Sequence, residues 1–249
     1  QVSRGLCASA AGDMKQLHRM IDELRKWMPF TPSAKVVCFG VTYDASDDAQ
    51  REAFMEDFRS RVLLTYRSGL EPPLQLAGGG TKSSDSGWGC MLRVTQMMLA
   101  QCFVTLGLGR AWRFNEAEDL AEGSLYLRIV SCFLDTPAAP FSLHRLVETG
   151  QQVLGKEPSA WFGPTSAAQA VGHLFQDLKS KASAGAPEFL RGVSCAVFVD
   201  GPIYKANVSQ AKRRLCRVPA QDKQSRLLLV VYDRTRISFE GLQAHAGLV

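Results

Sequence analysis

The sequence predicts an α+β fold, with helices in the first two-thirds of the chain and strands near its end. Apolar residues recur at helical spacing in several early stretches, and residues 91–106 are apolar on nearly every side. Two short apolar runs rich in branched residues follow at 193–199 and 227–232. At 46% hydrophobic and 21% charged residues, the 249-residue chain can bury a sizeable core and is not a disordered tail.

Helices and strands follow in order from these patterns. Residues 13–27 show an amphipathic helical repeat, and the apolar run at 34–40 predicts a strand. Phe54, Phe58, Val62 and Tyr66 lie four residues apart, which predicts one face of a helix over 47–66. The remaining expected elements are a turn-rich segment at 72–80, a helix over 115–135 weakened at Gly123, a short helix from Ser142 closed by Gly150, a helix opening at Pro164, and a basic segment at 205–217 between the two strands.

Composition excludes several classes of protein. No run of 18 apolar residues exists, and the first 30 residues carry charges within their apolar repeat, so we expect neither a membrane-spanning helix nor a signal peptide. Seven scattered cysteines indicate free thiols in a reducing, cytoplasmic setting. No Cys-x-x-Cys pair occurs, so we expect no metal and no cofactor. A net charge of +5 is mild, and a solvated helix face explains the basic segment better than nucleic acid does.

The sharpest chemical signal lies at 83–93, where a Gly-Trp-Gly turn leads into the buried helix at Cys90. The first amide groups of a helix are unpaired and carry partial positive charge, so a thiolate there is stabilised and nucleophilic. Gly89, with the glycine two residues before it, would let a substrate backbone approach closely, and Trp88 would line the cleft. The alternative is that Cys90 is one more buried cysteine, as we expect for Cys102.

This stretch resembles the nucleophile signature of the autophagins, the autophagy cysteine endopeptidases that process a ubiquitin-like modifier. The resemblance covers roughly residues 36–232 and implies a papain-like fold, in which a central helix begins at Cys90 and packs against an antiparallel sheet. The matching segments, in order, are TYR at 65–67, DSGWGCMLR at 85–93 followed by Gln96-Met97, FLD at 133–135, FSLH at 141–144, WFGP at 161–164 with Ala168-Gln169, and the strand at 227–231.

The resemblance implies a role for each of five candidate residues. Cys90 matches the nucleophile, and Tyr66 matches a tyrosine whose hydroxyl helps to stabilise the oxyanion. Trp161 matches a tryptophan that covers the active site and is displaced by substrate, while Trp88 and Gly89 belong to the substrate-binding entry. Periodicity alone leaves another interpretation open, in which Tyr66 lies on the core face of its helix and Trp161 anchors a helix entry.

The sequence departs from the family at the catalytic base. The family completes its triad with a histidine and an aspartate in an Asp-Pro-His motif, and that triplet occurs nowhere in this chain. His144 matches a family position that is not the base, and neither His173 nor His245 has matching neighbours. Since the base deprotonates the nucleophile, we expect either a fragment or splice form of a peptidase or an inactive homologue, with little activity from this chain as given.

The resemblance also implies a function and its partners. We expect a thiol endopeptidase that cleaves the ubiquitin-like autophagy modifier after its C-terminal glycine and releases it from phosphatidylethanolamine, in transient contact with autophagic membranes. The alternative is a catalytically dead homologue that binds the modifier without cutting it. We expect a monomer with no nucleic-acid partner, organised as an N-terminal helix and linker over 1–33 and a peptidase domain over 34–249 whose C-terminal part is missing.

Overall fold

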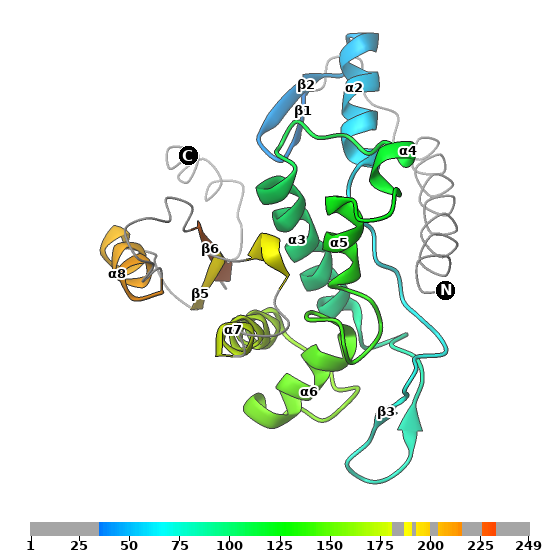
Figure 1. Ribbon diagram of the computed structural model, residues 1–249, viewed down its shortest axis with the longest axis vertical. Coiled ribbons are helices and arrows are strands. Elements are labelled where there is room, and N and C mark those ends of the chain that lie inside the picture. Colours follow the sequence, from blue (N-terminus) through cyan, green and yellow to red (C-terminus); the bar gives the residue numbers. More distant parts are fainter. Residues whose placement is uncertain (1–34, 181–186, 191–192, 200–203, 216–225, 233–249) are drawn as a thin grey trace. The chain divides into compact units, whose positions relative to one another are not determined.

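The computed structural model describes residues 35–180, 187–190, 193–199, 204–215 and 226–232 (Figure 1). The chain divides into two compact units. The first unit holds residues 1–73 and 83–143, and the second holds residues 74–82 and 144–249. The expected helix over 13–27 and the expected boundary after residue 33 lie outside the described residues, so the domain division inferred from the sequence stays a prediction.

The first unit begins with a hairpin. Strands β1 (Lys35–Cys38) and β2 (Val41–Asp44) are antiparallel, and Cys38 pairs with Val41 across a two-residue turn. The strand expected at 34–40 is therefore confirmed, although it ends two residues early. Strand β2 is missing from the sequence-based prediction, because its four residues are too few to show an alternating pattern.

Helix α2 (Asp48–Arg59) follows, capped by the carboxylate of Asp47. The helix predicted over 47–66 is wrong beyond Arg59. The Arg61 backbone N–H bonds the Phe58 carbonyl at 3.1 Å, and the Arg61 side chain takes the Asp57 carbonyl that this amide would bind in a continuing helix. The side-chain bond runs from Arg61 Nε to the Asp57 carbonyl at 2.7 Å, whereas the Ser60 backbone N–H still bonds the Glu56 carbonyl at 3.1 Å. Tyr66 consequently lies in a non-helical segment after α2.

The core of the first unit forms around helix α3 (Cys90–Gly107), which confirms the helix expected at 91–106. Leu92, Leu99 and Phe103 are fully buried, and the Phe103 ring lies 5.5 Å from that of Phe141. Among the described residues, α3 has the length and apolar composition of a membrane-spanning helix, yet half of it is buried inside the protein, as is usual for a core helix.

The helix predicted over 115–135 is two helices, α4 (Glu116–Asp119) and α5 (Leu125–Ser131). Gly123 separates them with a positive φ of 81°, a left-handed conformation that a helix cannot contain. Helix α5 then packs against the C-terminal end of α3, where the Leu125 side chain fills the space beside Gly107. The interruption therefore lets the second helix turn onto the core.

The second unit contains a short hairpin, β3 (Leu74–Gln75) with β4 (Thr81–Lys82), and helices α6 (Leu143–Leu154) and α7 (Pro164–Ser180). The predicted end of α6 at Gly150 is wrong. Gly150 lies inside α6, where an added Cβ would sit 2.3 Å from Cζ of Phe162, so this glycine serves close packing rather than termination. The start of α7 at Pro164 is confirmed.

The late strands form a parallel pair. Strands β5 (Val193–Val199) and β6 (Arg226–Tyr232) are joined through helix α8 (Lys205–Leu215), and Val193 pairs with Arg226. The antiparallel sheet implied by the family resemblance is therefore wrong for these two strands, because a helical crossover returns the chain in the same direction. Helices α7 and α8 both contact β5 within this unit.

Candidate active site

The nucleophile candidate Cys90 is half-buried and is the first residue of α3. The preceding turn is closed by the carbonyl of Asp85, which accepts the backbone N–H of Trp88 at 3.3 Å and that of Gly89 at 2.8 Å. Gly89 is the N-cap, so no side chain covers the first amides of α3, and its first turn carries no acidic residue. Partial positive charge at this helix end therefore acts on the Cys90 sulfur.

Gly89 is required by close packing inside the turn. A Cβ at this position would lie 2.7 Å from both Cβ and Oδ2 of Asp85. The space that the missing side chain leaves is thus occupied by the protein's own aspartate. A substrate contact at Gly89 stays a prediction.

A buried ion network fixes the start of α3. The Asp85 carboxylate is inaccessible to solvent, and it accepts the Arg67 backbone N–H at 2.6 Å and Arg93 Nε at 2.7 Å. Nη1 and Nη2 of Arg93 donate to the two carboxylate oxygens of Asp135 at 2.8 and 3.0 Å. Arg93 also donates to Gln96 Oε1 at 3.1 Å. Cys90 therefore lies one turn before a guanidinium that is held on two sides.

These network residues belong to the family-like motifs, but their sequence pattern alone does not predict a role for them. Burial disfavours the charged form of Arg93, yet hydrogen bonds to Asp135 and Asp85 outweigh it and raise the pKa of the guanidinium. One sequence signal for this network exists: Asp85 and Arg93 are oppositely charged residues at the entry of an otherwise apolar helix. Because arginine is almost never buried unless it is paired, such an arginine indicates a buried ion pair. The partner at Asp135, 42 residues away, has no local signal.

Tyr66 is connected through the backbone to the turn at residues 85–89, which precedes Cys90. Its neighbour Arg67 donates to the Asp85 carboxylate, and Ser68 forms an antiparallel bridge with Ser84. The Tyr66 side chain is 50% exposed, so the interpretation of Tyr66 as a core residue on a helix face is wrong. Its contribution to an oxyanion site stays a prediction.

Trp88 and Trp161 differ in exposure. Trp88 is buried, and its indole Nε1 donates to the Ser84 carbonyl at 3.0 Å, so it anchors the turn at residues 85–89. Trp161 lies in the second unit and is 69% exposed, while the next residue, Phe162, is buried. The interpretation of Trp161 as a helix-entry anchor is therefore wrong, since Phe162 fills that place. The substrate roles of both tryptophans stay predictions.

Comparison with known proteins assigns the family. The peptidase C54 catalytic domain matches residues 51–244. The chain belongs to this family. Similar curated proteins are the probable cysteine proteases ATG4 of Pichia angusta (40% identical over 138 residues, 47% of this chain and 26% of the relative), Phaeosphaeria nodorum (40% over 169 residues, 59% and 34%) and Aspergillus niger (39% over 150 residues, 51% and 35%). The chain thus spans about a third or less of the length of these relatives.

Three other described cysteines of the first unit, Cys38, Cys102 and Cys132, are poorly suited to nucleophilic chemistry. Burial raises the pKa of Cys102, and it raises that of Cys132 to about 12. Burial and the negative charge of Asp57 also raise the pKa of Cys38. A thiol that stays protonated is a weak nucleophile, so these three cysteines are poor candidates, and the role of Cys90 as the nucleophile stays a prediction.

The described histidines lie in the second unit. His144 is buried near the start of α6, and His173 lines a cavity of about 580 Å³ between α7, β5 and α8. His245 lies outside the described residues. Within the part of the chain that the structure describes, no group of three His, Cys, Asp or Glu residues could hold a metal ion.

Proposed function

We propose that this C54 domain is the nucleophile-bearing part of a cysteine endopeptidase that cleaves the ubiquitin-like autophagy modifier after its C-terminal glycine. The placement of Cys90 at the uncapped start of α3, in a turn held by Asp85, is the observation that carries this proposal. The relatives named as ATG4 cysteine proteases support the autophagy setting. The same attack would release the modifier from phosphatidylethanolamine, because both leaving groups are amines on the same glycine carbonyl.

The proposed role of each group follows from the negative charge that develops on the oxygen of the scissile carbonyl during the reaction. The Cys90 thiolate adds to the scissile carbonyl carbon, and the carbonyl electron pair moves onto oxygen. The Cys90 backbone N–H and the Tyr66 hydroxyl are the proposed donors to that oxyanion. Collapse of the tetrahedral intermediate expels the amine, which takes up a proton, and leaves a thioester at Cys90. Water then hydrolyses the thioester and frees the glycine carboxylate and the thiol.

The substrate surface in this proposal includes Trp88, Gly89 and Trp161. The large exposed area of Trp161 supports a role as a mobile cover, since an exposed indole can be displaced without opening a core. The proposed setting is a cytoplasmic monomer that contacts autophagic membranes only while it acts on the lipid-linked modifier. The 34–249 boundaries of the peptidase domain belong to the same proposal.

A second candidate is a modifier-binding module without hydrolysis. Among the described residues of the unit that holds Cys90 there is no histidine to serve as general base. Such a module would bind the modifier equally well after Cys90→Ala, because binding would use the surface and not the thiolate.

The test uses the modifier fused at its C-terminal glycine to a thiol-trapping electrophile. The chain as given and a C-terminally extended form, each also as Cys90→Ala, are incubated with the probe, and the labelled residue is mapped by mass spectrometry. Labelling at Cys90 in the extended form supports the peptidase. Binding that survives Cys90→Ala, without labelling of either form, supports the binding module and overturns the peptidase proposal.

A further inference from the structure

The loop between α6 and α7, residues 155–163, contains a strained turn. The Ala160 backbone N–H donates to the Glu157 carbonyl at 2.9 Å, with Pro158 and Ser159 between them. Ser159 has a φ of 69°, in the left-handed region that few residues other than glycine adopt. A proline followed by a positive φ is typical of a type II turn, in which glycine or asparagine normally occupies the position of Ser159. Such strain persists only where the surrounding contacts fix the backbone.

The α6–α7 loop is anchored inside the second unit. Two of its side chains, those of Pro158 and Phe162, are buried. Gly150 of α6 contacts the loop near both of its ends, because its carbonyl accepts the Lys156 backbone N–H at 2.9 Å and its Cα lies beside the Phe162 ring. A displacement of the loop backbone would therefore break this hydrogen bond or pull the Phe162 ring away from Gly150.

The Trp161 backbone is held between this turn and a lysine. The Trp161 carbonyl accepts a hydrogen bond from Lys156 Nζ at 3.2 Å, and the preceding residue, Ala160, is held by the turn. The Lys156 side chain thus joins the start of the loop to its end. The Trp161 side chain, in contrast, is 69% exposed. Rotation about its side-chain bonds leaves these backbone contacts in place, whereas a movement of its backbone breaks them.

We propose that Lys156 is a positioning residue for Trp161. Its ammonium group holds the Trp161 backbone, so that substrate displaces the indole by rotating the side chain while the loop stays in place. A charged donor makes a stronger hydrogen bond to a carbonyl than a neutral donor does. Exposed side chains change rotamer within nanoseconds, whereas loops rearrange more slowly. The inference rests on the proposed function in taking Trp161 as the cover, but the hold of Lys156 on the loop does not depend on that role.

The first test replaces Lys156 by methionine, which keeps an unbranched side chain and removes the hydrogen-bond donor. The buried anchors of the loop remain, so the melting temperature should stay within about 2 °C of that of the parent. Hydrogen exchange of the Ala160 amide, followed by NMR, should become about fivefold faster, because the turn loses a contact and opens more often. Lys156→Arg, whose guanidinium can also donate to the Trp161 carbonyl, should restore the exchange rate of the parent.

Lys82→Met is the matched control, since Lys82 is an exposed lysine of β4 in the same unit. It should leave the exchange rate of the Ala160 amide unchanged. Equal exchange rates in the parent and Lys156→Met would overturn the positioning role of Lys156. An equal increase in Lys82→Met, or a failure of Lys156→Arg to restore the rate, would overturn it as well.

The second test follows the indole directly by fluorine NMR. The four tryptophans are replaced by fluorotryptophan, and the Trp161 resonance is assigned with Trp161→Phe. Addition of the modifier should shift the Trp161 resonance, while the Ala160 amide keeps its protection from exchange. Loss of that protection on binding would mean that the loop opens, and the proposal would be wrong. An unchanged Trp161 resonance would contradict the cover role in the proposed function, whereas the first test alone decides the role of Lys156.

Discussion

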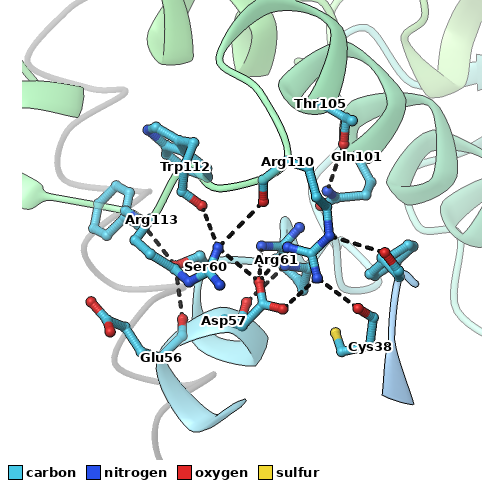
Figure 2. Close-up of polar contacts among 12 residues, drawn as sticks. Cys38, Glu56, Asp57, Ser60, Arg61, Gln101, Thr105, Arg110, Trp112 and Arg113 are labelled. Carbon is cyan, nitrogen blue, oxygen red and sulfur yellow. Dashed lines mark hydrogen bonds and ion pairs between the residues drawn. The ribbon is translucent and has the colours of Figure 1, made fainter. Parts of the chain in front are cut away.

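Replacing Asp57 by asparagine tests how the first unit is held together. The Asp57 carboxylate is inaccessible to solvent, and it accepts hydrogen bonds from Tyr43, Arg61 and Arg110 at 2.8, 2.5 and 2.5–2.9 Å (Figure 2). Arg113 lies 3.1 Å from the same carboxylate. These partners come from the hairpin, from the end of α2 and from the loop after α3, so one side chain joins three segments.

The magnitude follows from the acidity of this carboxyl. Burial favours its neutral form, but hydrogen bonds from Arg110 and Tyr43 and the charges of Arg61 and Arg113 outweigh burial and lower the pKa of Asp57 from 3.8 to about 2. That difference corresponds to about 2.4 kcal/mol of folding free energy at neutral pH. Asparagine would also leave three guanidinium groups without a counter-charge. We therefore expect Asp57→Asn to cost about 2–4 kcal/mol.

The assay is urea denaturation of the parent and Asp57→Asn across a range of pH. Because the folded pKa lies below the unfolded one, the ionic contribution is fully present above about pH 4 and is lost as the pH falls toward 2. The difference between the proteins should therefore shrink below pH 4. Asp48→Asn is the control, since its pair with Arg51 is exposed, and it should cost at most about 0.5 kcal/mol. A loss under 1 kcal/mol at pH 7, or one independent of pH, would refute this reasoning.

Three further predictions concern single contacts. Gly89→Ala should slow alkylation of Cys90 by iodoacetamide, followed by peptide mapping, because its Cβ would collide with Asp85 and shift the helix start. An unchanged rate would show that the turn adjusts freely. Gly150→Ala should lower the melting temperature by several degrees, because the added Cβ would lie 2.3 Å from Cζ of the buried Phe162, whose ring would have to shift. A rise in the melting temperature, as expected for alanine in an open helix, would contradict the packing argument. Cys90→Ser should change the melting temperature by less than about 1 °C while abolishing labelling by the modifier probe, since the sulfur is not part of the core. A large loss of stability would mean that Cys90 is structural.

Sequence patterns predicted the elements whose signals are local and long. The α3 helix and the β5 strand are stretches of mostly apolar residues, and the predicted bounds of both lie within one residue of the observed ones. The spacing of Phe54, Phe58, Val62 and Tyr66 does not predict the end of α2, because it cannot reveal that the Arg61 side chain, and not the Arg61 amide, binds the Asp57 carbonyl. Gly150 was misjudged for a similar reason, since its close partner Phe162 is distant in sequence.

The candidate site shows the same limit. The position of Cys90 at the start of a helix could be predicted, because a glycine-rich turn directly before an apolar helical run is a local signal. The contacts that hold this turn could not be predicted, because Asp85 acts through two different groups. Its carboxylate binds the Arg67 amide and Arg93, whereas its backbone carbonyl closes the turn at Gly89. A single buried residue thereby fixes the segment that carries Tyr66 and the helix that carries Cys90. The position of the proposed oxyanion donors relative to the thiol thus depends on a residue with no chemical step of its own.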